Sequence, residues 1–212
     1  MAPAIKLCGI SNSDALAAAL SARADYVGFN FYPPSPRFVE LAAVTALGAQ
    51  AAGRAQRVGV FVDADDAAIA AAVATGALDA LQLHGSEIPA RAAELRARHG
   101  LPVWKVLAIS AREDFARAAA YAGAADFILF DAKTPKGTLP GGMGLVFDWA
   151  LLAAWDRSMP WGLAGGLTPD NVGEAARLTG APLVDAASGI ESAPGIKDVD
   201  RIAAFCKAAR NT

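Results

Sequence analysis

Eight short apolar runs recur along the chain at spacings of roughly 20–35 residues, with helix-compatible stretches between them. The runs are residues 4–8, 25–31, 57–62, 80–84, 103–109, 126–132, 160–166 and 181–187. Strands that alternate with helices predict a parallel sheet with right-handed crossovers. Eight such units in 212 residues fit a (β/α)8 barrel, so we predict one α/β domain, a TIM barrel, over residues 1–212. An open doubly wound sheet is the alternative, but the GxGxxG that usually follows its first strand is absent.

Residues that begin and end helices lie between the predicted strands. Ser13 or Asp14 is expected to cap the first helix, because a short polar side chain accepts hydrogen bonds from the free N–H groups there. Thr168 stands before Pro169, and proline suits the first position of a helix because its missing N–H costs nothing. Glycines, which readily adopt the left-handed conformation that ends a helix, follow helical runs at Gly76, Gly100, Gly123 and Gly180.

Composition excludes several classes of protein. No run reaches the ~18 apolar residues of a membrane-spanning helix, and the first residues, MAPAIKLCGI, lack the pattern of a signal peptide. Two cysteines and two histidines without a close cluster argue against a disulfide framework or a structural zinc site. A net charge of −2 gives no basic field for nucleic acid. We therefore expect a cytoplasmic protein without metal, membrane or nucleic-acid partner, and this charge is compatible with a small anionic ligand.

The predicted barrel limits where chemistry can take place, because active sites of such barrels form at the carboxyl ends of the strands. Cys206 and His99 lie in helical stretches and are expected to be structural. The candidate functional residues at strand ends and in the following loops are Cys8, residues 30–37, Asp63, His84, Asp131, residues 165–166 and residues 185–189.

Cys8 and Asp131 lie at the ends of the first and sixth predicted strands. If both side chains point into the barrel, a thiol and a carboxyl meet at its rim as a candidate base and acid. The thiol must ionise, which Lys6 on the same strand face would favour, and the carboxyl must be held protonated by burial. The structural alternatives are core packing for Cys8, and a helix cap or an ion pair with Lys133 for Asp131.

Glycines follow the seventh and eighth predicted strands, in the segments GLAGGLTPDNV and VDAASGIES. Glycine lets the backbone approach a ligand and point N–H groups at it, and helix N-termini add positive dipole ends. This pair of loops is a frequent phosphate site in (β/α)8 barrels. We therefore predict that phosphate binds at these two loops, with plain tight turns as the alternative.

Three other segments carry candidate binding groups. Arg37 follows a proline-rich loop, and its planar guanidinium suits a carboxylate, a surface ion pair with Glu40 being the alternative. His84 is a candidate proton shuttle or orienting donor, or a hydrogen-bonded rim histidine without catalytic duty. Residues 139–149, LPGGMGLVFDW, are a glycine-rich loop that is able to fold over a bound ligand.

Seven segments, in this order, resemble the phosphoribosylanthranilate isomerases of tryptophan biosynthesis. They are IKLCGISN, GFNFYPPSPRFV, VGVFVD, LQLHG, LFDAKTPKGTLPGGMGLVFDW, LAGGLTPDNV and VDAASGIESAPGIKD. Together they run from residue 5 to residue 198, so the resemblance covers nearly the whole chain. One segment alone would be weak, but the ordered set is highly specific.

The resemblance implies a (β/α)8 barrel with no metal or organic cofactor. Its members convert N-(5-phospho-β-D-ribosyl)anthranilate to 1-(2-carboxyphenylamino)-1-deoxy-D-ribulose 5-phosphate by an Amadori rearrangement, an aldose–ketose isomerisation. By position, Cys8 would be the general base and Asp131 the general acid. Arg37, His84 and Asp185 would bind the substrate, Arg37 through the anthranilate carboxylate and Asp185 through the ribose hydroxyls. The residues implied to bind its phosphate are Gly165, Gly166, Ser188 and Gly189.

The sequence departs from the family pattern at a few positions. Ala186 and Ala187 stand where the family more often has a branched residue and a serine or asparagine, and Met143 replaces a small polar residue. The family includes monomers and dimers, so we expect a monomer or a homodimer with a phosphorylated small molecule as its partner. The alternatives are another metal-free sugar-phosphate isomerase barrel, or a barrel that binds a phosphorylated metabolite without catalysis. The second would not require both Cys8 and Asp131.

Overall fold

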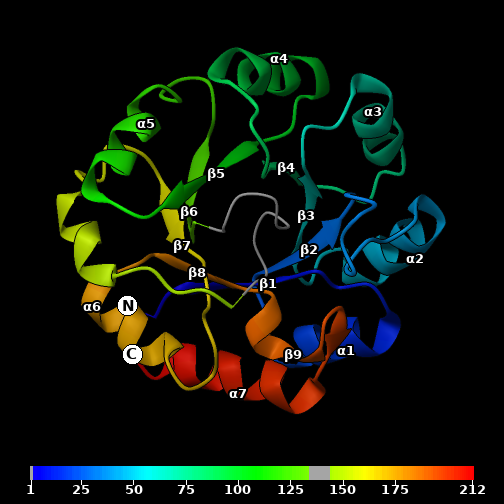
Figure 1. Cartoon of the computed structure of the whole chain (residues 1–212). Helices are drawn as coiled ribbons and strands as arrows, with labels where there is room; N and C mark the ends of the chain where they lie inside the picture. Colours follow the sequence, from blue (N-terminus) through cyan, green and yellow to red (C-terminus); the bar gives the residue numbers. More distant parts are fainter. Residues whose placement is uncertain (1, 134–143) are drawn as a thin grey trace.

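Eight parallel strands form a closed barrel, in which each strand pairs with its neighbours in the chain and the first pairs with the last (Figure 1). The computed structural model describes residues 2–133 and 144–212. The strands are β1 (Ala4–Cys8), β2 (Tyr26–Asn30), β3 (Gln56–Phe61), β4 (Ala80–Leu83), β5 (Val103–Ile109), β6 (Phe127–Ala132), β7 (Trp161–Leu163) and β8 (Leu183–Ala186). Each predicted apolar run overlaps one of these strands, with β3 beginning one residue before its run, which confirms the predicted (β/α)8 barrel.

Helices surround the barrel and cover its outer face (Figure 1). They are α1 (Ser13–Ser21), α2 (Leu41–Ala51), α3 (Asp66–Ala74), α4 (Pro89–His99), α5 (Ala116–Ala119), α6 (Val172–Thr179) and α7 (Val199–Arg210). Short 3-10 segments are η1 (Arg112–Phe115), η2 (Trp149–Ala154) and η3 (Ser188–Ile190), and a hairpin of β9 (Glu191–Ala193) and β10 (Ile196–Lys197) follows β8. The helical run predicted before Gly123 is thus divided into η1 and a single turn of α5.

Two predicted helix starts are wrong. The cap of α1 is Asn12, whose side chain accepts from the N–H of Ala15 at 2.9 Å. The start of α6 is Val172 rather than Pro169. Here the side chain of Asn171 bonds the N–H of Thr168 and the carbonyl of Gly166, at 2.8 and 3.0 Å, and these bonds hold the preceding residues in a turn. The predicted helix ends at Gly100 and Gly180 are confirmed, with φ of +66° and +63°.

The barrel interior is closed by aromatic side chains at the amino ends of the strands. The ring of Trp104 lies 5.1 Å from that of Tyr26 and 4.6 Å from that of Phe127. Buried apolar residues continue this inner cluster, namely Val58, Ala80, Val106, Leu129, Ala164 and Leu183. A second, larger core lies between the strands and the helices. Among the described residues, side chains thus fill the interior at the amino ends of the strands, which leaves the carboxyl ends as the side for a ligand.

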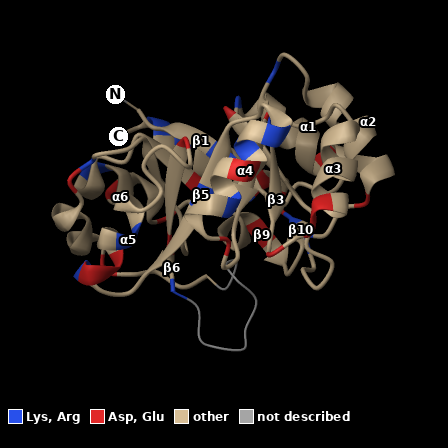
Figure 2. Cartoon of the chain, turned by 90° about the horizontal axis from the view of Figure 1, so that it is seen from above, with Lys and Arg blue, Asp and Glu red and all other residues tan. Residues whose placement is uncertain are grey.

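The two chain ends lie side by side at the amino-end rim of the barrel (Figures 1 and 2). Basic and acidic residues are mixed on the surface, as on α4, which carries both signs (Figure 2). Within residues 2–133 and 144–212, none of the helices combines the length and the apolar character that a membrane crossing needs.

Candidate active site

The carboxyl ends of the strands bring together the predicted acid, base and two further candidates. Cys8 ends β1, Asp131 lies near the end of β6, Asp185 lies in β8, and His84 follows β4. The charges of Asp131 and His84 both affect the pKa of Asp185, and Asp185 in turn affects the pKa of Cys8. The four side chains therefore share one electrostatic environment inside the mouth of the barrel.

Lys6 is fully buried below Cys8, and its Nζ lies 2.9 Å from Oδ2 of Asp185 on the neighbouring strand. The second carboxylate oxygen, Oδ1 of Asp185, is buried and has no hydrogen-bond partner in the described part of the chain. Gly28 on β2 leaves space for these groups, because a Cβ there would lie 3.0 Å from Sγ of Cys8 and 3.3 Å from Nζ of Lys6. The ammonium and the thiol are thus close neighbours.

Burial raises the pKa of the Cys8 thiol, although the Lys6 charge acts in the opposite direction. Burial likewise raises the pKa of Asp185 and outweighs the effect of Lys6 on it. The expectation that Lys6 favours the thiolate is therefore correct in sign, but burial is the larger effect. Burial therefore opposes the loss of the proton from sulfur that a basic role of Cys8 would need.

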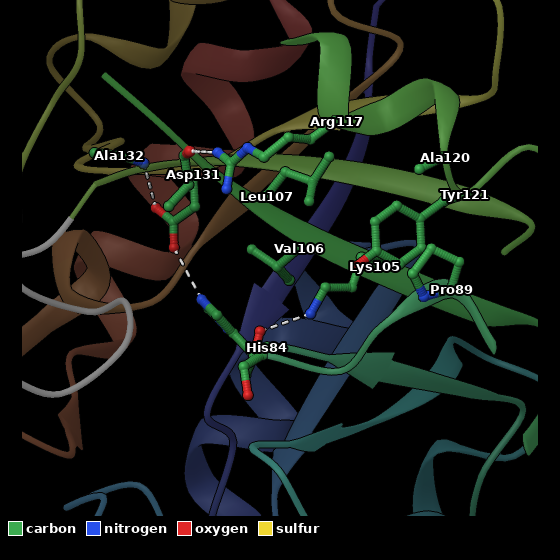
Figure 3. A pocket seen from close by; sticks show the side chains of 13 residues that line it. His84, Pro89, Lys105, Val106, Leu107, Arg117, Ala120, Tyr121, Asp131 and Ala132 are labelled. Atoms are coloured by element: carbon green, nitrogen blue, oxygen red, sulfur yellow. Dashed lines mark hydrogen bonds and ion pairs between the residues drawn. The ribbon is translucent and has the colours of Figure 1, made fainter. Parts of the chain in front are cut away.

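Asp131 is buried at the rim and both of its carboxylate oxygens have partners. Oδ1 accepts from the N–H of Ala132 at 2.8 Å, and Oδ2 lies 3.2 Å from Nε2 of His84 (Figure 3). Gly165, in the loop after β7, has a φ of +86°, and a Cβ on it would lie 2.5 Å from the nitrogen of Ala132 and 2.9 Å from Oδ1 of Asp131. Glycine is therefore required where this loop touches the carboxyl group.

The turn that carries His84 is held by a buried ion pair of Glu87 and Lys105, which we call the turn cluster. Nζ of Lys105 lies 2.7 Å from Oε2 of Glu87 and donates to the carbonyl of Gly85 at 2.7 Å. The carboxylate of Glu87 also accepts from the N–H groups of Gly85 and Asp63, at 2.9 and 2.8 Å. These bonds fix the turn after β4, and with it the direction in which the imidazole of His84 points.

A pocket of about 390 Å³ opens beside His84 and Asp131 (Figure 3). Its walls come from the end of β5 and from the segments that carry Pro89 and Tyr121. The hydroxyl of Tyr121 donates to the carbonyl of Glu87 at 2.7 Å, so this wall is joined to the turn cluster. The His84–Asp131 pair therefore faces a hollow of the surface and is not sealed in the core.

The loops after β7 and β8 pack directly on each other at the predicted phosphate site. Gly166, like Gly165, has a positive φ, +61°, and within the described part of the chain neither N–H donates a hydrogen bond. A Cβ on Gly189 would lie 1.9 Å from the carbonyl oxygen of Leu167, so the η3 turn touches the other loop backbone to backbone. Ser188 begins η3. Available N–H groups at such a junction suit an anion.

Arg37 is buried, 7% exposed, so the alternative of a surface ion pair is wrong. Its Nε and Nη2 lie 2.7 and 2.8 Å from the two carboxylate oxygens of Glu191, and Nζ of Lys197 lies 2.7 Å from Oε1 of the same carboxylate. We call Arg37, Glu191 and Lys197 the anchor cluster. A Cβ on Gly9, directly after β1, would lie 2.7 Å from Cδ of Arg37, so the cluster adjoins the end of β1.

Five buried polar residues near the mouth were not singled out from the sequence: Gln82, Glu87, Lys105, Glu191 and Lys197. Lys105 carried the same signal as Lys6, a lysine inside an apolar strand, which requires a buried carboxylate partner. Gln82 gave a weaker signal of the same kind in the run ALQLH. Neither amide atom of Gln82 has a hydrogen-bond partner among the described residues.

Part of the predicted glycine-rich loop, residues 139–143 with Met143, lies outside the described residues. The end of that loop contacts the candidate phosphate site, because a Cβ on Gly166 would lie 2.7 Å from the carbonyl oxygen of Leu145 and 2.5 Å from a methyl of Val146. In the described part of the chain, no three His, Cys, Asp or Glu side chains are grouped in a way that would hold a metal ion.

Sequence comparison places this chain among proteins of one kind. Residues 5–208 match the family described as N-(5'phosphoribosyl)anthranilate (PRA) isomerase. The N-(5'-phosphoribosyl)anthranilate isomerase of Paramagnetospirillum magneticum is 51% identical over 207 residues, which are 97% of this chain and 96% of that protein. The same enzyme of Paracoccus denitrificans is 52% identical over 206 residues, again 97% and 96% of the two chains.

Solved structures show the same likeness. A phosphoribosyl anthranilate isomerase from Thermotoga maritima has a TM-score of 0.88 and 35% identity, with 100% of both chains covered. An isomerase in complex with reduced 1-(o-carboxyphenylamino)-1-deoxyribulose 5-phosphate has a TM-score of 0.84 and 31% identity over 100% of both chains. A further Thermotoga maritima structure, described as monomers generated from a dimeric isomerase, has a TM-score of 0.83 and 33% identity over 100% of both chains. The likeness thus extends over the whole barrel.

Proposed function

The chain belongs to the N-(5'-phosphoribosyl)anthranilate isomerase family, and we propose that Cys8 is the base and Asp131 the acid of its reaction. The enzyme converts N-(5-phospho-β-D-ribosyl)anthranilate to 1-(2-carboxyphenylamino)-1-deoxy-D-ribulose 5-phosphate in tryptophan biosynthesis. The observation that supports these two roles is their placement: a buried thiol and a buried carboxyl at the carboxyl ends of β1 and β6, in one mouth.

The proposed reaction begins at Asp131, which protonates the ring oxygen of the ribose. The bond between C1 and the ring oxygen breaks, and the nitrogen lone pair forms a Schiff base with C1. Cys8, as thiolate, then takes the proton from C2, and the electron pair of that C–H bond gives an enolamine. Tautomerisation places a proton on C1 and removes the one on the C2 hydroxyl, which leaves the ketone. General acid and base groups in such positions typically contribute about 10²–10⁴-fold each to the rate.

The acid and the base need opposite protonation states at the start. Asp131 must carry a proton and Cys8 must not, although burial raises the pKa of the Cys8 thiol. The pair therefore works with one proton in total, which must lie on Asp131 and not on Cys8 when the reaction begins. Nε2 of His84, 3.2 Å from Oδ2 of Asp131, is the proposed orienting contact for the acid and for the substrate beside it.

Both charged ends of the substrate have proposed binding groups. Arg37 would pair with the anthranilate carboxylate, since its planar fork matches a carboxylate. The N–H groups of the loops after β7 and β8 would hold the phosphate, at Gly165, Gly166, Ser188 and Gly189. Asp185 would contact the ribose hydroxyls. Its Oδ1, which has no partner in the described part of the chain, supports this role, as does its place beside Lys6 and Cys8.

The proposed site residues gather at the mouth of one barrel, an arrangement compatible with activity as a monomer or as a homodimer. We propose that the enzyme acts in the cytoplasm, because a free catalytic thiol such as Cys8 stays reduced there. The reduced ketose named for the solved complex is the proposed tight ligand of this chain as well.

The test of the proposed roles is turnover by Cys8→Ser and Asp131→Asn, followed by the loss of substrate fluorescence. We expect kcat to fall by about 10²–10⁴-fold in each, with KM nearly unchanged, because each side chain acts in the transition state. Cys206→Ser is the matched control, since Cys206 is also buried but lies in α7, away from the mouth. Turnover near that of the wild type in Cys8→Ser would remove Cys8 as the base.

A further inference from the structure

The anchor cluster joins the two groups proposed to hold the charged ends of the substrate, because it contains Arg37 and contacts the backbone before Ser188. Arg37, proposed for the carboxylate, is in the loop after β2, whereas Ser188 and Gly189, proposed for the phosphate, follow β8. Arg37 and its partner Glu191 are 154 residues apart in the chain. The contact thus joins two loops that are far apart in the chain.

Glu191 holds the guanidinium of Arg37 in one orientation. Two parallel bonds, of 2.7 and 2.8 Å, join Nε and Nη2 to the two carboxylate oxygens. A bidentate pair of this kind fixes the plane of the guanidinium as well as its position. Although burial acts in the other direction, Arg37 and Lys197 hold the pKa of Glu191 below its usual value, so the carboxylate stays charged.

Lys197 joins the same carboxylate to the phosphate loop. Its Nζ lies 2.7 Å from Oε1 of Glu191 and donates to the carbonyl of Ala187 at 2.9 Å. Ala187 directly precedes Ser188, where the η3 turn begins. One buried ammonium therefore contacts both the partner of Arg37 and the backbone that leads into the proposed phosphate site.

Backbone contacts support the cluster from behind. The N–H of Gly195, in the turn of the β9–β10 hairpin, donates to Oε2 of Glu191 at 3.2 Å. Gly195 has a φ of +81°, and a Cβ on it would lie 2.4 Å from the carbonyl oxygen of Pro36, next to Arg37. From α7, Arg201 donates to the carbonyl of Glu191 at 2.9 Å. The β9–β10 hairpin thus touches the loop after β2 directly, next to the ion pairs of the anchor cluster.

The cluster also has more basic than acidic side chains. Two basic side chains, Arg37 and Lys197, share the carboxylate of Glu191, and burial lowers the pKa of Lys197 from its usual value. The turn cluster across the mouth has one cation and one carboxylate and is neutral. A ligand with an anion at each end matches a cluster that has an excess of basic side chains.

We propose that Glu191 and Lys197 are positioning residues that set the distance between Arg37 and the Ser188–Gly189 turn. The enzyme then binds the carboxylate and the phosphate of one substrate molecule at the same time. The inference rests on the proposed role of Arg37. Recognition then depends on both charged groups of the substrate. A ligand with both groups at the right separation gains affinity from the cluster, and a ligand with only one of them gains little.

The experiment measures the binding of two ligands to Glu191→Gln and to Lys197→Met. One ligand is the reduced ketose, which carries both a carboxylate and a phosphate, and the other is inorganic phosphate. We expect each variant to weaken the binding of the reduced ketose, and to raise KM, by roughly 10- to 100-fold, with kcat changed far less. The binding of inorganic phosphate should weaken less than threefold. Glu40→Gln, the same change at an exposed residue three positions from Arg37, is the matched control.

Two further variants separate the possible failures. Arg37→Ala should weaken the binding of the reduced ketose. Adding Glu191→Gln to Arg37→Ala should cause little further loss of affinity, because Glu191 acts through Arg37. If Arg37→Ala leaves the affinity unchanged, the proposed carboxylate site is wrong. If Arg37→Ala weakens binding but Glu191→Gln does not, only the positioning role is overturned. A Glu191→Gln enzyme with lower thermal stability, an unchanged KM and a lower kcat would also overturn it, and Lys197→Arg, which keeps the charge, should restore most of the affinity.

Discussion

The anchor cluster and the turn cluster lie on opposite sides of the barrel mouth, beside β1, β2 and β8 in one case and beside β4 and β5 in the other (Figure 1). Both contain a buried lysine 2.7 Å from a glutamate. They differ in what surrounds the glutamate. The carboxylate of Glu87 accepts its other hydrogen bonds from backbone N–H groups, whereas the carboxylate of Glu191 also pairs with a second basic side chain, Arg37.

This difference in partners gives the two clusters different uses. A neutral pair with backbone donors makes a turn rigid without attracting anions, and in the turn cluster the rigid element carries His84 toward Asp131. A cluster with an extra basic side chain lies next to the proposed sites for both anionic ends of the substrate. Buried ion pairs are poor evidence for stability by themselves, because desolvation offsets much of their attraction. Their geometry and net charge are more informative about function.

The largest effect that distinguishes the clusters is expected from Lys105→Met. The change leaves the buried carboxylate of Glu87 without its cation, which should lower the free energy of unfolding by about 3 kcal/mol. The loosened turn should also misplace His84 and lower kcat by about tenfold while KM changes little. Urea unfolding and steady-state kinetics measure both quantities. A rise in KM equal to that of Lys197→Met would show that the two clusters do not have separate roles; Lys207→Met, on the exposed face of α7, is the control.

A medium effect is expected in the dependence of kcat/KM on pH. The acid–base pair must hold one proton, which Asp131 donates to the substrate. At high pH Cys8 releases this shared proton, the pair then holds none, and activity is lost. Burial raises the pKa of Cys8 and Lys6 and Lys197 act against this rise, so the alkaline limb should lie above the ordinary pKa of a thiol. Lys197→Met removes the charge that opposes this rise, and should shift the limb to higher pH over the range in which Lys197, whose own pKa burial lowers, is still protonated. Lys105→Met should leave the limb in place, and an equal shift in both variants would contradict the distinction.

The smallest effect concerns Gln82, which lies inside the barrel between the two clusters. Strand registers place it in the same inward-facing layer as Asp185 and Leu129. Because both of its amide atoms lack partners in the described part of the chain, Gln82→Met should raise the free energy of unfolding by about 1 kcal/mol. Thermal or urea unfolding tests this, with the exposed Gln56→Met as the control. A loss of stability together with a large fall in kcat/KM would instead assign Gln82 a part in binding.

Most of the fold was predictable, because its signals are local. Alternation of apolar runs with helical stretches is readable in windows of a few residues, and each of the eight runs overlaps a strand. The helix starts were less predictable. Asn12 caps α1 and Asn171 delays α6 through side-chain bonds whose geometry depends on how the preceding loop is folded.

The candidate site was predictable only as a set of positions. Cys8, His84, Asp131 and Asp185 could be selected because barrel chemistry lies at strand ends, and the structure brings them together there. Their protonation was not predictable, because it depends on burial. Lys6 beside Cys8 suggested an easily ionised thiol, yet burial raises the pKa of that thiol.

By itself, the sequence determined the number and order of the strands, the parallel barrel, and the identity of the side chains available at its mouth. Only the tertiary structure decided which of them become partners. Lys6 pairs with Asp185 across 179 residues, and Arg37 pairs with Glu191 across 154. The physical reason is that a strand follows from residues next to one another, whereas an ion pair between residues far apart in the chain forms only after the barrel has closed and brought their backbones together.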